Sequence, residues 1–156
     1  MFSKLHALSL GLAASLAFTG SALALDASEL ITKGKTAAQI LSSEGIDAGS
    51  VKLGDPAQGY LDLDNSGLHT FGVNRKGIIL FDHSKQTEKG MDISGFALPT
   101  GSTVVDDILK AVDNGDGTFS WPGDAIPHPV TGALQSSTVH CEAVNSSDIV
   151  CAMAWF

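Results

Sequence analysis

The sequence has few positive charges and few aromatic side chains. Lysine and arginine total 9 against 17 aspartates and glutamates, which gives a formal net charge of −8, and Arg75 is the only arginine. An acidic chain is repelled by the phosphates of nucleic acids and by anionic membrane surfaces. The composition therefore predicts that the chain does not bind nucleic acid.

The sequence also lacks the short motifs that identify common enzymes. It contains no nucleophile elbow, no H-E-x-x-H and no glycine-rich phosphate loop followed by lysine. Carboxylates are numerous, but no pair has a spacing that demands acid–base chemistry. We therefore expect a protein that is not an enzyme and holds no cofactor. A small hydrolase or metal-dependent enzyme of another type remains as the third alternative.

Potential metal-binding patterns are incomplete. Asp62-x-Asp64-x-Ser66-Gly67 matches the opening half of a calcium loop, but the twelfth position is Val73 instead of a bidentate glutamate, which favours a polar turn. No H-x-x-x-H pattern and no Cys/His cluster is present. We expect no metal site from the four histidines that follow residue 24, which are His69, His83, His128 and His140.

The first 24 residues have the pattern of a secretory signal peptide. Lys4 supplies a basic start, Leu8–Phe18 is a short apolar run, and Ala22-Leu23-Ala24 is a small-x-small cleavage site. The apolar run is shorter than the ~20 residues that a spanning helix needs. We expect a periplasmic or secreted protein whose mature chain begins at Leu25, with an uncleaved N-terminal anchor as the alternative.

Only two cysteines are present, and both lie near the C-terminus. An exported chain enters an oxidising compartment, and the spacing of Cys141 and Cys151 is not that of a C-x-x-C redox or metal motif. A disulfide between them is the interpretation that the pattern favours.

Three strands are predicted in the last forty residues. Thr118–Trp121 ends at Pro122, and Leu134–Val144 and Ile149–Phe156 are separated by a short polar turn. With Ser146 at the centre of this turn, the register pairs Cys141 with Cys151, Ala143 with Ile149 and Val139 with Met153. Because side chains alternate along a strand, these residues share one apolar face with Trp155, while the other face is mixed.

The preceding residues predict two helices, a hairpin and a long loop. The expected segments are a helix over Ala27–Ser43, a loop over Ile46–Ala57, an extended Gly59–Leu63, a hairpin of His69–Val73 and Ile78–Phe81, an irregular Ser84–Gly101 and a helix over Thr103–Val112. This order indicates an α+β domain with a five-stranded antiparallel sheet, an N-terminal helix and a short mid-chain helix.

Several short motifs together resemble a known family. They are Gly59-Tyr60, Phe81-Asp82-His83, Gly90-Met91-Asp92, Gly115-x-Gly117, Phe119-x-Trp121-Pro122 and the closing strand pair. In this order they resemble single Cache domains, which are PAS-like extracytoplasmic sensor modules. The resemblance covers residues 59–156, preceded by a helix and connector over 25–58. The basic residue common on the penultimate strand of the family is absent, and Ser137, Thr138 and His140 stand there.

The resemblance implies a pocket between the sheet and the long loop with the short helix. The ligand would be a small metabolite such as an organic acid or an amino-acid-like molecule. By position, the candidate ligand-binding residues are Tyr60, Phe71, His83, Trp121, His140 and Asp148. The implied partners are this metabolite, a membrane-bound signalling protein and a second copy of the chain. The second hypothesis is a secreted interaction module whose sheet has lost its pocket.

Overall fold

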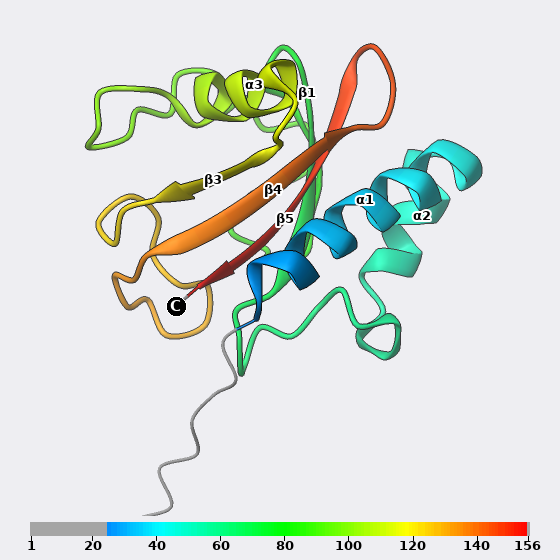
Figure 1. The fold of residues 1–156 in the computed structure, drawn as a ribbon, viewed down its shortest axis with the longest axis horizontal. Coiled ribbons are helices and arrows are strands. Elements are labelled where there is room, and N and C mark those ends of the chain that lie inside the picture. The colour runs from blue at the N-terminus through cyan, green and yellow to red at the C-terminus, as the bar shows by residue number, and fades with distance from the viewer. Residues whose placement is uncertain (1–24, 156) are drawn as a thin grey trace, which may run out of the picture.

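The computed structural model describes residues 25–155, and its centre is a single antiparallel sheet (Figure 1). The strands are β1 (His69–Asn74), β2 (Ile79–Asp82), β3 (Thr118–Trp121), β4 (Ser137–Ala143) and β5 (Asp148–Trp155). Their spatial order is β2-β1-β5-β4-β3, so β5, the last strand in sequence, lies in the middle. The predicted α+β class with five antiparallel strands is confirmed. The predicted signal peptide and Phe156 lie outside the described residues.

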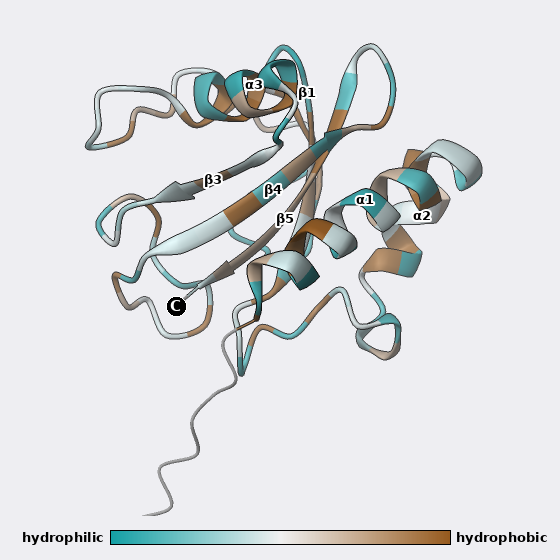
Figure 2. Cartoon of the chain, viewed as in Figure 1, coloured by the Kyte–Doolittle hydropathy of each residue, from teal (hydrophilic) through white to brown (hydrophobic). Residues whose placement is uncertain are grey.

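Two consecutive helices cover one face of the sheet. Helix α1 (Ala27–Glu44) begins at Asp26, whose side chain accepts the N–H of Ser28, and ends at Gly45. It packs across β4 and β5, and Figure 2 shows that it carries both hydrophobic and hydrophilic residues. The helix predicted over residues 27–43 is therefore confirmed. The mixed face of the β4–β5 hairpin is the face that α1 covers.

The predicted loop over Ile46–Ala57 is wrong. Helix α2 (Ile46–Leu53) occupies most of it, and a short 3₁₀ turn follows at Pro56–Gln58. Leu53 is fully buried in a cluster with Leu41 and Phe81. Gly49 lies close against Leu41, where an added Cβ would be 2.9 Å from a side-chain carbon. Tertiary packing thus stabilises a helix of only about two turns, which its own sequence does not predict.

The opposite face of the sheet is covered by α3 (Val104–Asn114) and by irregular segments. Thr103 caps α3 by accepting the N–H of Asp106, and Gly115 ends it with a positive φ of 84°. Val105 and Ile108 pack in the main core with Val139, Cys141 and other residues of β4 and β5. This is the apolar face that the sequence predicts.

The β4–β5 hairpin has the predicted register. Cys141 pairs with Cys151, Ala143 with Ile149 and Val139 with Met153. Sulfur atoms of Cys141 and Cys151 form a disulfide that joins the two strands on the main-core face. The predicted cysteine pairing is confirmed.

The segment before β1 is not a strand. Residues 59–63, predicted as extended, contribute only a bridge between Asp62 and Leu68, and the chain between these two residues is a turn. The hairpin itself is present, with Gly77 at a positive φ of 85° in its turn and with β2 beginning one residue later than predicted. Among residues 25–155, the helices are too short or too polar to cross a membrane.

Candidate functional site

A cavity of about 250 Å³ lies between the main-core face of the sheet and the segments that follow β2 and β3. Its floor comes from β1, β2, β3 and β5, and its cover comes from residues 84–104 and 126–127. The lining is His69, Phe71, Ile79, Asp82, Ser84, Gln86, Thr87, Ile93, Phe96, Val104, Trp121, Ile126, Pro127 and Met153. Most of these side chains are apolar, and the polar ones gather where β1 and β2 meet the long loop. This is the composition of a small-molecule pocket.

The polar end of the cavity is organised by Asp82, the last residue of β2. Its Oδ1 accepts the N–H and the hydroxyl of Ser84 at 2.8 and 2.6 Å. Its Oδ2 accepts the N–H and the hydroxyl of Thr87 at 3.0 and 2.7 Å. The carboxylate side chain is only 6% exposed. These four bonds fix the start of the long loop against the sheet and shape this wall of the cavity.

His69, the first residue of β1, stands beside Asp82 and is 2% exposed. Its Nδ1 donates to the carbonyl oxygen of Gly67 at 3.1 Å, and its Nε2 lies 4.0 Å from Oδ1 of Asp82. The ring stacks on Trp155 with 5.3 Å between centroids. Burial is the main effect on the imidazole and lowers the pKa of His69, although Gly67 and Asp82 oppose the shift. The ring is therefore neutral at pH 7.

Trp121 forms part of the apolar wall, at the end of β3. Its indole Nε1 donates to Oδ2 of Asp107 on α3 at 2.9 Å, and its ring packs edge-on to Phe119. Asp107 holds the indole and so ties α3 to β3.

The six predicted ligand-binding residues do not meet at one place. Phe71 and Trp121 line the cavity. His83 and His140 point to the α1–α2 side of the sheet: His83 binds Oγ1 of Thr70 at 2.8 Å and lies against Gly54, just past α2. The other two lie outside the cavity lining. Tyr60 lies beneath Lys33 in the connector before β1, and Asp148 is the first residue of β5.

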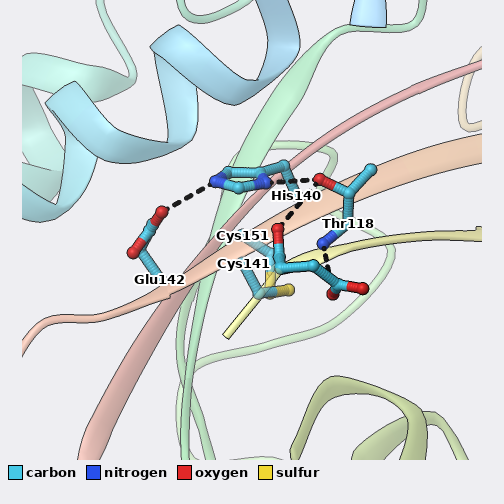
Figure 3. Close-up of a disulfide and its surroundings, with 6 residues drawn as sticks. Thr118, His140, Cys141, Glu142 and Cys151 are labelled. Carbon is cyan, nitrogen blue, oxygen red and sulfur yellow. Dashed lines mark hydrogen bonds and ion pairs between the residues drawn. A yellow bond between two sulfur atoms is a disulfide. The ribbon is translucent and has the colours of Figure 1, made fainter. Parts of the chain in front are cut away.

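His140 is the buried member of a row of polar side chains beside the disulfide (Figure 3). Its Nδ1 lies 2.7 Å from Oγ1 of Thr118, and its Nε2 lies 2.9 Å from Oε1 of Glu142. The order hydroxyl, imidazole, carboxylate is that of a hydrolytic triad. However, His140 is 2% exposed and Gly34 of α1 packs directly on its ring. The row joins β3 to β4 beneath α1, where no substrate has access to the imidazole.

Two polar cavity residues, His69 and Asp82, were not among the predicted ones. Strand alternation is the signal that identifies both. Phe71 pairs with Asp82 and with Cys151, so these three residues point to one face, and His69 lies two residues before Phe71 on the same face. His83 follows Asp82 and must point the other way. In residues 25–155, no three histidine, cysteine or acidic side chains converge as a metal site would require.

Comparisons with known proteins identify the fold. No family model matches the chain, and no curated protein sequence matches it. Among solved structures, a methyl-accepting chemotaxis protein from Vibrio parahaemolyticus RIMD 2210633 superposes with a TM-score of 0.62 at 16% identity, covering 82% of this chain and 86% of that one. A Cache chemosensory domain described for carboxylic acid recognition gives 0.61 at 15%, covering 82% and 91%.

A third match is the periplasmic sensor domain of a chemotaxis protein, with a TM-score of 0.58 at 12% identity, covering 82% of this chain and 93% of that one. The match covers 82% of this chain, which is more than residues 59–156 alone make up. The structural similarity therefore extends into the segment before Gly59. Sequence identities this low establish the fold alone. The chain has the fold of Cache sensor domains, as its sequence motifs predict.

Proposed function

We propose that the protein is an extracytoplasmic sensing or binding module that takes a small molecule into the cavity between the sheet and its long loop. The observation that carries the proposal is the cavity itself, in which an apolar wall beside Trp121 faces a polar end made by His69 and Asp82. An interaction module that had lost its pocket would have this space filled by apolar side chains. The Cache sensor domains with the same fold support the proposal.

The size and lining of the cavity limit the ligand. A volume of about 250 Å³ is below the usual 300–1,000 Å³ of pockets for drug-sized molecules, so the ligand is a small metabolite. The resemblance to single Cache domains implied an organic acid or an amino-acid-like molecule. The lining contains no lysine or arginine, and an organic acid would therefore lack the cationic partner that usually binds carboxylates.

The proposed compartment and partners follow from the predicted signal peptide and from the sensor domains with this fold. We propose that the chain is exported, is cleaved before Leu25, and reports ligand binding to a membrane-bound signalling protein or acts as a free binding protein. A homodimer is part of the same proposal. The intact mass of the exported protein tests the cleavage directly, because it identifies the first residue of the mature chain.

The decisive experiment is a thermal-shift screen of the exported, oxidised protein against amino acids, amines, alcohols, organic acids and purines. A ligand present at 100 times its dissociation constant stabilises the folded state by about 2.7 kcal/mol, which raises the melting temperature of a domain of this size by several degrees. A flat screen with a folded protein would overturn the proposal and favour the interaction module.

A matched pair of variants tests whether a ligand found in the screen binds in the cavity. Phe96 lines the cavity and is 52% exposed, so Phe96→Ala removes ligand contacts with little effect on the core. Val51 on α2 is also an exposed apolar side chain, at 77%, but lies outside the cavity. We expect Phe96→Ala to weaken binding and Val51→Ala to leave it unchanged. Equal effects of the two variants would place the binding site elsewhere.

A further inference from the structure

The hydroxyl and indole donors of the cavity lining are already engaged within the protein. The hydroxyls of Ser84 and Thr87 donate to Asp82. Indole Nε1 of Trp121 donates away from the cavity, to Asp107 of α3. A ligand in this cavity therefore meets lone pairs of these hydroxyls and not their O–H groups. One lone pair of Ser84 Oγ is already engaged, because it accepts the N–H of Gln86 at 3.2 Å.

His69 adds an acceptor at the same end of the cavity. Its Nδ1 contacts a carbonyl oxygen, that of Gly67, which can only accept, so Nδ1 must carry the proton. In the neutral ring, Nε2 is then an acceptor with a free lone pair. Within residues 25–155, Nε2 has no hydrogen-bond partner, and its nearest charged neighbour is the carboxylate of Asp82 at 4.0 Å. A donor supplied by the ligand would satisfy it.

The charge of the cavity lining also favours a ligand head group that donates hydrogen bonds over an anionic one. Asp82 is the only acidic side chain in the lining, which contains no lysine or arginine. Gln86 keeps one free N–H, because the other donates to the carbonyl of Pro127, but this side chain lies at the exposed rim. A ligand carboxylate at the polar end would face a second carboxylate and an imidazole lone pair, and a buried charge without partners is costly.

We propose that the cavity selects a small ligand with an apolar body and a head group that donates hydrogen bonds, an amine or an alcohol, and that it rejects the carboxylate of the same size. The inference rests on the proposed function and assigns the ligand class of that site. In this arrangement, Nε2 of His69 accepts from the head group, while Phe71, Val104 and Met153 contact the body.

The test compares three probes that share one carbon chain: butylamine, butanol and butyrate. Each is titrated at neutral pH into the exported protein, and the melting temperature and the binding heat are recorded. We expect butylamine or butanol to raise the melting temperature in a saturable manner and butyrate to have no effect. An equal or larger response to butyrate, or no response to any of the three probes, overturns the inference.

Two variants attribute the selectivity to His69. His69→Phe retains an aromatic ring to stack on Trp155 but removes the acceptor. We expect this variant to lose the preference for butylamine or butanol over butyrate. His69→Gln retains an acceptor oxygen and should keep this preference. His83→Gln, on the opposite face of the sheet, is the matched control. If His69→Phe does not fold, the ¹⁵N shift of His69 Nε2 in the unmodified protein must move with butylamine or butanol. Unchanged selectivity in His69→Phe, or an unmoved shift, overturns the assignment.

Failure of this ligand-class inference can be distinguished from failure of the proposed function. A response to butyrate alone contradicts the ligand class and leaves a small-molecule sensor standing. The sensing function itself is contradicted only when the full metabolite screen is also flat.

Discussion

At the scale of single residues, Gly34 shows how closely α1 approaches the sheet. A Cβ at this position would lie 2.5 Å from Cδ2 of His140 and 3.2 Å from its carbonyl oxygen. Alanine would ordinarily stabilise a helix by about 1 kcal/mol relative to glycine, whereas overpacking costs about 1–3 kcal/mol. The clash involves a ring that two hydrogen bonds hold in place, so the cost of overpacking exceeds the gain in helix propensity.

We therefore predict that Gly34→Ala lowers the free energy of unfolding by up to about 2 kcal/mol. Urea unfolding of the oxidised protein measures it. Lys35→Ala is the control, because Lys35 is the next residue of α1 and is exposed. Equal or greater stability of Gly34→Ala would contradict the close packing of α1 on His140.

Two histidines predict the pH dependence of stability. Burial lowers the pKa of His69 and of His83 in the folded protein. An unfolded histidine titrates near pH 6.5, so below this pH the unfolded chain binds protons that the folded protein does not, and stability falls. We expect the melting temperature to decrease from pH 7.5 to about 5.5.

The same titration of His83→Gln should be less steep, because one of the two imidazoles has been removed. A melting temperature that stays constant or rises toward pH 5.5 would contradict the burial of these rings as neutral imidazoles.

At the scale of elements, the β4–β5 hairpin is stabilised by its disulfide. The cysteines are 10 residues apart, and in the chain-entropy model a loop of this length contributes roughly 3 kcal/mol. We predict that the double variant Cys141→Ser, Cys151→Ser loses roughly this much stability in urea unfolding and keeps its sheet, as judged by circular dichroism. Wild type under reducing conditions should match the variant. An unchanged midpoint would show that the cross-link does not constrain the unfolded chain.

The elements differ in how far their sequences predict them. The register of the hairpin was predictable to the residue, because alternation and a short polar turn permit one register that buries the apolar face. The strand bounds were less exact, since β4 begins at Ser137 and not at Leu134. The first helix was predictable from its spacing of apolar residues. The α2 segment was not, because Gly49 and only two turns of sequence give a weak helical signal, and the contact with Leu41 that stabilises it is tertiary.

At the scale of the whole molecule, the resemblance to single Cache domains implied a pocket beneath the long loop, but none of the charged, amide, hydroxyl or imidazole side chains that line the cavity was among the predicted residues. Strand alternation places Asp82 on the same face as Phe71 and His83 on the other face. Only the packing of α1 and α2 shows that the face of His83 is the one they cover. The same alternation places His140 on the face covered by α1, whereas its neighbour Cys141 lies on the opposite, main-core face. Of the predicted residues, Phe71 and Trp121 line the cavity, because both belong to the main-core face of the sheet.

The most direct test of the central claim is backbone amide NMR of the ¹⁵N-labelled, oxidised protein titrated with the strongest compound from the metabolite screen. The account predicts that shift changes concentrate in residues 69–71 and 82–87 and at Ile126, around the cavity, and leave α1 unaffected. Shift changes confined to α1 and α2, or no change with any compound, would contradict a ligand site between the sheet and the long loop.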